Sequence, residues 1–210
     1  MKRIILTVIV TLMATVAIAQ SEDKRGFEIG VETGLTSLVN SPAISPIWGA
    51  PEAYTGVDYH LRIGCRHGAN AFALVYGGIP LYTERATHLE TSAQFELSLK
   101  YRRFLCRWEK LEPYCGASVG AVCTWTGFDY GNDRYENTWW NNRLELETGV
   151  MIAISSRSSF DISFGLFSGG LMAHRDINVP SGMQPTERAG FSGYRVALGY
   201  SFHLYKQNRE

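Results

Sequence analysis

The most constraining feature of the sequence is an alternation of apolar with polar or small side chains, repeated in separate segments of about ten to fourteen residues. Residues 95–102 show it clearly, because apolar residues stand at every odd position and polar residues at every even one. A period of two places successive side chains on opposite faces of a β-strand. The chain is therefore predicted to be all-β, with one apolar and one polar face to each strand.

Eight segments follow this pattern, although Gly77, Gly78 and Pro80 interrupt the third, and proline removes a donor from a ladder. The connections after odd-numbered segments are long, about 10 to 18 residues, and the others are short, about 4 to 7 residues. An even strand number with this alternation predicts an eight-stranded antiparallel up-and-down transmembrane β-barrel, with both chain ends on the side of the short turns. The predicted strands cover residues 27–35, 53–65, 71–82, 95–102, 115–125, 143–154, 160–166 and 194–204.

The first nineteen residues have the organisation of a cleaved signal peptide. Lys2 and Arg3 precede an apolar run from residue 4 to residue 16, and small residues follow before Gln20. A membrane anchor needs roughly 18 or more apolar residues, and this run is shorter. Residues 1–19 are therefore predicted to direct export, and residues 20–210 to form one barrel domain. This domain has two more acidic than basic residues, a balance that does not suggest nucleic acid as a partner.

The polar faces of the predicted strands contain few lysines, whereas the outer surface of a soluble protein is rich in them. Glycine and serine are instead mixed with charges that nearly cancel, a set that suits a narrow barrel interior in which each buried charge has a partner. We predict that the apolar faces meet lipid and that paired charges plug the lumen. A soluble lipocalin-like binding barrel, with the faces reversed, is the alternative. The predicted interior charges are Glu28, Glu32, Asp58, His60, Arg62, Glu96, Lys100, Arg102, Arg143, Glu145, Glu147, Asp161, Arg195 and His203.

Tyrosine and tryptophan gather near the predicted strand ends. In a membrane barrel such residues form girdles, because their rings are apolar and their polar tips reach water. The predicted girdle residues are Tyr54, Tyr82, Trp108, Tyr114, Trp125, Tyr130, Trp139, Trp140, Tyr194 and Tyr205.

On these patterns the chain resembles the small outer-membrane barrels of the OmpA transmembrane-domain and OmpX type, and more loosely the porin-family barrels of Bacteroidetes. The resemblance implies the outer membrane of a Gram-negative cell, with membrane lipid and lipopolysaccharide as surroundings. The last strand also resembles the signal of the barrel-assembly machinery, through Gly199, Phe202 and Leu204. It departs from that signal because Ala197 replaces a usual polar residue and the chain continues to Glu210.

The function predicted is a structural or surface-interaction role without catalysis. Tyr130, Trp139 and Trp140 lie in the third long connection, where aromatic side chains could bind an extracellular ligand that the sequence does not identify, or serve as part of the girdle. The alternative is a lipid A-modifying enzyme, because His174 lies at the outer end of the seventh strand. Asp176 stands where the serine of the similar deacylases would be.

Four cysteines enter a compartment that permits disulfides, namely Cys65, Cys106, Cys115 and Cys123. Cys106 and Cys115 flank one short connection, and a bridge between them is one of the pairings that the sequence leaves open. The cysteines do not have zinc-ligand spacing, and the glycine-rich stretches are not followed by a phosphate-binding helix. We therefore predict no cofactor and no metal.

Overall fold

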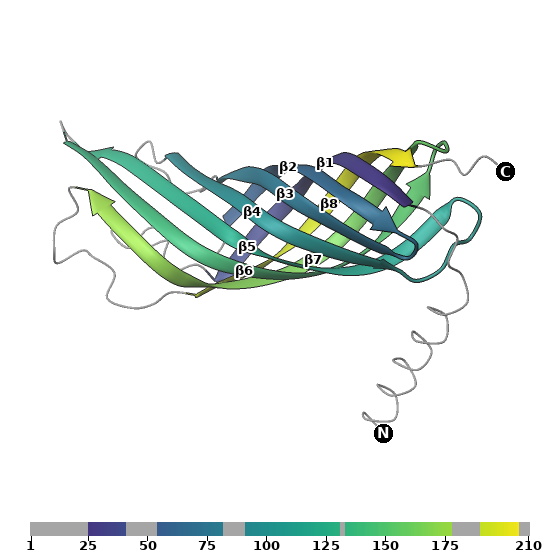
Figure 1. Ribbon diagram of the computed structural model, residues 1–210. Coiled ribbons are helices and arrows are strands. Elements are labelled where there is room, and N and C mark those ends of the chain that lie inside the picture. The colour runs from purple at the N-terminus through teal and green to yellow at the C-terminus, as the bar shows by residue number, and fades with distance from the viewer. Residues whose placement is uncertain (1–24, 41–53, 82–90, 131–132, 178–189, 206–210) are drawn as a thin grey trace, which may run out of the picture.

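The computed structural model describes residues 25–40, 54–81, 91–130, 133–177 and 190–205, which form a closed eight-stranded antiparallel β-barrel (Figure 1). Every strand pairs with its neighbours in the sequence, and β1 pairs with β8 to close the barrel. The predicted fold class is thus confirmed. The strands are β1 (Arg25–Asn40), β2 (Tyr54–His67), β3 (Asn70–Leu81), β4 (Thr91–Phe104), β5 (Leu111–Tyr130), β6 (Asp133–Ala153), β7 (Ser158–Ile177) and β8 (Gly190–Tyr205).

The two ends of the barrel differ. At one end the start of β1 pairs with the end of β8, where Gly26 lies opposite Tyr205. The connections at this end are short and comprise residues 68–69, 105–110 and 154–157. At the other end β5, β6 and β7 extend beyond the remaining strands (Figure 1). Among the described residues, no helix is long and apolar enough to cross a membrane. The predicted signal peptide lies outside the described residues.

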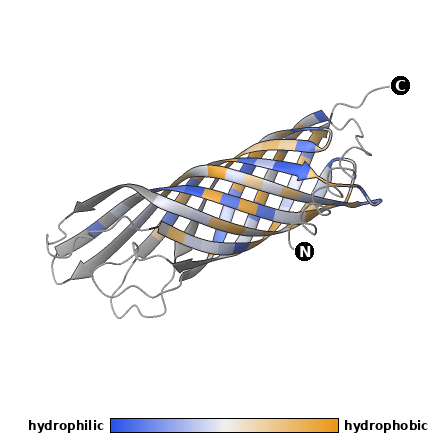
Figure 2. Cartoon of the chain, turned by 90° about the horizontal axis from the view of Figure 1, so that it is seen from below, coloured by the Kyte–Doolittle hydropathy of each residue, from blue (hydrophilic) through white to orange (hydrophobic). Residues whose placement is uncertain are grey.

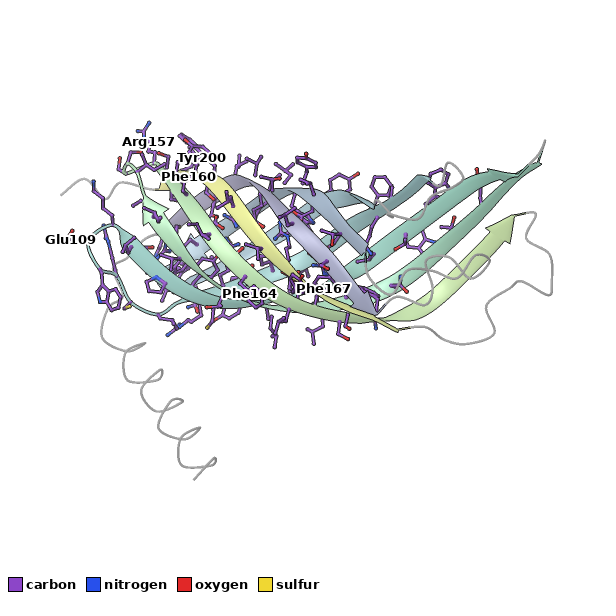
Figure 3. All side chains as sticks on the ribbon, turned by 180° about the vertical axis from the view of Figure 1, so that it is seen from behind. Glu109, Arg157, Phe160, Phe164, Phe167 and Tyr200 are labelled. Atoms are coloured by element: carbon purple, nitrogen blue, oxygen red, sulfur yellow. The ribbon has the colours of Figure 1, made fainter. Side chains whose placement is uncertain are left out.

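Apolar side chains cover the outside of the barrel and charged ones fill the inside. Figure 2 shows hydrophobic and hydrophilic residues alternating along the strands. On β5, Val119 is 58% exposed on the outer face, whereas Val122 is 0% exposed on the inner face. On β7, Phe160 and Phe164 are exposed and Phe167 is buried (Figure 3). A soluble protein has the reverse distribution, because water favours burial of apolar surface.

The β5–β6 hairpin is much longer than the sequence predicted. Its ladder continues from Leu111 opposite Ile152 to Tyr130 opposite Asp133, so only residues 131–132 connect the two strands. The prediction of a long loop there is wrong. The segment contains five aromatic residues, which favour strands: Phe128, Tyr130, Tyr135, Trp139 and Trp140. Cross-strand pairs then extend a hairpin that has already formed.

β3 is a regular strand despite the glycines and the proline that obscured it. Gly77 faces inward, and a Cβ atom there would overlap the imidazole ring of His60 and the carbonyl oxygen of Tyr59. Glycine is therefore required at this position to leave room for a histidine inside the barrel. Pro80 pairs with Ala93 near the end of the strand.

Candidate functional site

The structure places all fourteen of the predicted interior charges inside the barrel, where each side chain is buried. Two further charged residues that were not predicted, Arg66 and Glu112, are also buried inside the barrel, where they contact each other at 2.6 Å. Arg66 and Glu112 were missed because they lie beyond the ends of the predicted strands, where the alternation of apolar and polar residues is no longer clear. Each is nevertheless in phase with the inward positions of its strand. The buried set thus has eight carboxylates, six Arg or Lys side chains and two histidines.

Glu32 is the most highly connected member of this set. Its carboxylate accepts from Arg62, from Arg102 at 2.8 Å, from Arg195 at 3.0 Å and from Lys100 at 3.4 Å. Glu32 is only 3% exposed. A carboxylate so far from water is stable only with such partners, because an unpaired buried charge is costly.

The ion pairs connect opposite walls of the barrel. Arg62 on β2 donates to Asp161 on β7 at 3.2 Å and to Ser201 on β8 at 2.5 Å. Arg102 on β4 donates to Glu147 on β6 at 2.6 Å as well as to Glu32 on β1. Side chains from six strands therefore meet at the centre of the lumen, as the diameter of an eight-stranded barrel allows.

A second group of charges lies farther toward the extended end. Arg195 binds Asp58 through two hydrogen bonds of 2.8 Å each, in a paired geometry that suits a guanidinium and a carboxylate. Arg143 donates to Glu96 and to Glu145 at 2.6 Å each, and its guanidinium lies 4.0 Å from the ring centroid of Phe167. Packing of this kind adds an attraction of the cation for the aromatic face.

The end of the lumen near the short turns contains an aromatic cluster. Phe104 and Tyr114 pack with ring centroids 5.6 Å apart, Met151 completes the cluster, and the guanidinium of Arg66 lies 3.7 Å from the ring centroid of Phe104. The assignment of Tyr114 to the girdle is wrong. Tyr114 has the same inward phase along β5 as Gly116 and Ser118. That phase could have placed it in the lumen, but the prediction followed its aromatic residue type instead.

Ser159, His203 and Glu28 have the order of a nucleophile, a base and an orienting acid. The Ser159 hydroxyl lies 2.7 Å from His203 Nε2, and His203 Nδ1 lies 3.6 Å from the Glu28 carboxylate. Ser159 is 1% exposed, and Arg62 holds Glu28 at 2.7 Å. Because a substrate must reach the hydroxyl of a nucleophile, we interpret these contacts as part of the packing of the lumen.

The Cys106–Cys115 bridge is absent, because all four cysteines are free thiols. The register explains this: Cys115 pairs with Arg103 and faces outward, so Cys106 lies farther along the hairpin and not opposite Cys115. A disulfide needs Cα atoms within about 7 Å and facing Cβ atoms. Within the described residues, the side chains do not form a group of three or more that could hold a metal ion.

The predicted loop-binding residues lie on the extended hairpin. Trp140 is 48% exposed, whereas Asn141 is buried in the lumen, in phase with Arg143. The pairing of β6 with β7 shifts its register between Trp140 and Asn141. Tyr130 and Trp139 are in the strands, but their side chains lie outside the part that the structure describes, as does that of His174 on β7.

Comparison with known proteins identifies the fold. No protein-family model matches the chain, and no curated protein matches its sequence. Among solved structures, the chain is similar to Neisserial surface protein A, with a TM-score of 0.60 and 15% identity over 86% of this chain and 99% of that one. A major outer membrane protein of Thermus thermophilus gives a TM-score of 0.47 at 14% identity over 84% of this chain and 99% of that one. The first of these likenesses shows that the two chains share a barrel fold.

Proposed function

We propose that this chain spans the outer membrane of a Gram-negative cell as a narrow barrel whose lumen is closed by paired charges, and that it has a structural or surface-interaction role. The observation that carries the proposal is the distribution of side chains. Large apolar residues, among them Leu99 at 64% exposure, cover the outside, and water does not favour such a surface. Hydrocarbon does, and a closed barrel leaves no unpaired strand edge within it.

The outer-membrane location is supported by the fold shared with Neisserial surface protein A and by the predicted signal peptide. In this proposal the barrel-assembly machinery inserts the chain, and lipopolysaccharide surrounds the extended end. The short turns and the ends of β1 and β8 face the periplasm. The soluble lipocalin-like alternative is disfavoured, because the charged side chains that contact Glu32 occupy the part of the lumen in which such a barrel would hold its ligand.

Electrical recording tests whether the lumen is closed. The network around Glu32 joins β1, β2, β4 and β8, so the central lumen has no continuous path for hydrated ions in this proposal. We expect the purified protein in planar lipid bilayers to give at most small, infrequent conductance steps. An unrelated open porin, inserted in the same bilayer, is the positive control. Large and steady openings would contradict a closed lumen.

The surface-interaction role is supported by the extension of β5, β6 and β7 and by the exposed Trp140, which precedes this extension on β6 in space, opposite Cys123. Exposed tryptophans are frequent anchors in binding surfaces. Removal of residues 128–135, with an Asn-Gly turn joining Gly127 to Glu136, shortens the β5–β6 hairpin where the two residues already pair. We expect the barrel to remain resistant to sodium dodecyl sulfate until it is boiled. The deletion removes Tyr130 but keeps Trp140, so Trp140→Ala in the full-length hairpin is the companion variant. Adhesion of expressing cells to immobilised glycans or extracellular-matrix proteins should fall in both variants, and unchanged adhesion in both would refute this role for the hairpin.

The enzyme alternative is not proposed as the function, because Asp176 stands near His174 where the nucleophilic serine would be. The buried Ser159 and His203 contact each other inside the lumen, away from the lipid face on which a lipid A-modifying enzyme would bind its substrate. Lipid A mass spectra from cells with and without the protein distinguish the two possibilities, and identical spectra are expected.

A further inference from the structure

At the end of the barrel with the short turns, the exposed side chains that the structure describes include more cations than carboxylates. Among its described residues, five Arg or Lys side chains are exposed or half-buried, whereas Glu109 is the single exposed acid. The carboxylate of Glu112 is buried and contacts Arg66 at 2.6 Å and Arg107 at 3.6 Å. We call the five cations the basic rim: Arg25, Arg103, Arg107, Lys110 and Arg157.

The connection between β4 and β5 presents part of this rim on a tight hairpin tip. The Trp108 N–H donates to the Leu111 carbonyl at 2.8 Å, and the Leu111 N–H donates to the Trp108 carbonyl at 2.7 Å. Glu109 and Lys110 form the two-residue turn between them, and Glu109 has a φ of 51°. Trp108 is 66% exposed. The tip therefore carries an exposed indole ring two residues before an exposed ammonium group.

A second turn lies against this tip. The Lys110 carbonyl accepts a hydrogen bond of 2.8 Å from the Ala153 N–H, at the start of the turn that carries Arg157. In this turn the Ser155 and Ser158 hydroxyls are 2.8 Å apart. Glu109 and Arg157 appear at the same end of the barrel in Figure 3. Ammonium, guanidinium, hydroxyl and indole groups are thus gathered on two adjacent turns.

We propose that the basic rim binds the phosphates of anionic phospholipid headgroups, such as phosphatidylglycerol, in the leaflet that this end of the barrel meets. The inference rests on the proposed function. Arginine and lysine bind phosphate through charge-assisted hydrogen bonds, and Trp108 and Leu111 suit the boundary between headgroups and acyl chains. A zwitterionic headgroup such as phosphatidylcholine also carries a positive group, which the cations of the basic rim repel, so it should bind less well than phosphatidylglycerol. Each cation close to an anionic membrane strengthens binding about five-fold.

Native mass spectrometry of the full mature protein, released from nanodiscs of mixed phosphatidylglycerol and phosphatidylcholine, tests the proposal. The ratio of the two lipids that stay bound is the readout. The wild type should retain phosphatidylglycerol preferentially. Lys110→Gln and Arg157→Gln should each lower that preference about five-fold, and the double variant about 25-fold. Lys110→Arg is the matched control that should keep the preference, and Glu109→Gln should raise it.

Retention of the two lipids in equal amounts by the inserted wild type would overturn the proposal, as would binding to purified peptidoglycan without any lipid preference. Displacement of the bound lipid by millimolar soluble glycerophosphate would show that a free phosphate, not a membrane headgroup, is the ligand, and would equally overturn it. Failure of the protein to enter nanodiscs at all would instead refute the proposed membrane location, so the two failures are distinguishable.

Discussion

Replacement of Glu32 by glutamine is expected to lower the free energy of unfolding by about 3–5 kcal/mol. The carboxylate accepts hydrogen bonds from four cations on β2, β4 and β8, and the substitution leaves them buried without its charge. Urea unfolding of the refolded protein in phosphatidylcholine vesicles, followed by the heat-dependent gel shift, measures the loss. Glu109→Gln is the same chemical change on an exposed turn and should alter stability by less than about 0.5 kcal/mol.

A double-mutant cycle shows whether the loss arises from unpaired charge. Lys100→Met alone should destabilise the barrel, because Lys100 contacts both Glu32 and Glu147. In the Glu32→Gln background the same substitution removes a cation that has lost one of its two partners, so it should cost less or restore part of the stability. Equal costs in both backgrounds, or a loss below about 1 kcal/mol for Glu32→Gln, would contradict a coupled network.

Leu99→Arg should be the next most damaging substitution, with an expected cost of about 2–4 kcal/mol in a bilayer. Leu99 lies near the middle of β4 and is 64% exposed on the outer face. In water an arginine would be harmless there, because exposed apolar side chains contribute little to a soluble fold. At the centre of a membrane it must bring its charge into hydrocarbon.

Leu204→Arg is the matched control for depth. Leu204 is 53% exposed on the same outer face, but it lies at the end of β8 beside the short turns. The expected cost there is about 0–1 kcal/mol, because an arginine near the interface reaches the headgroups. Equal costs at Leu99 and Leu204, measured by the same vesicle unfolding assay, would mean that the outer face does not cross a hydrocarbon core.

Much of the barrel could be predicted because its two faces meet different surroundings. An apolar residue at every second position, as at Leu97 and Leu99, sets the phase of a strand, and that phase places Glu96 and Lys100 inside. The fold and the interior charges follow from this local information. Tyr114 was assigned to the girdle because of its residue type, although its phase along β5 is inward. Phe167 is also inward and lies one residue beyond the predicted strand 160–166.

The pairing inside the lumen could not be predicted from the sequence. Which cation contacts Glu32 depends on the stagger between strands. Arg195 is far from Glu32 in the sequence, but it lies on β8, the strand that pairs with β1, and its side chain reaches the Glu32 carboxylate. The length of β5 to β7 was also missed, because the alternation of apolar with polar residues stops before these strands end. The absent disulfide reflects a register that the cysteine positions alone do not fix.

Valine methyl groups test, with a single residue type, whether hydrocarbon surrounds the outer face and is excluded from the inner one. Val31, Val119 and Val196 are exposed on the outside, whereas Val75 and Val122 are buried inside. In nanodiscs with protonated acyl chains, nuclear Overhauser effects between lipid chains and methyl groups should appear at the three outer valines and not at the two inner ones. Contacts of the lipid chains with Val75 and Val122, and none with the outer valines, would contradict this account.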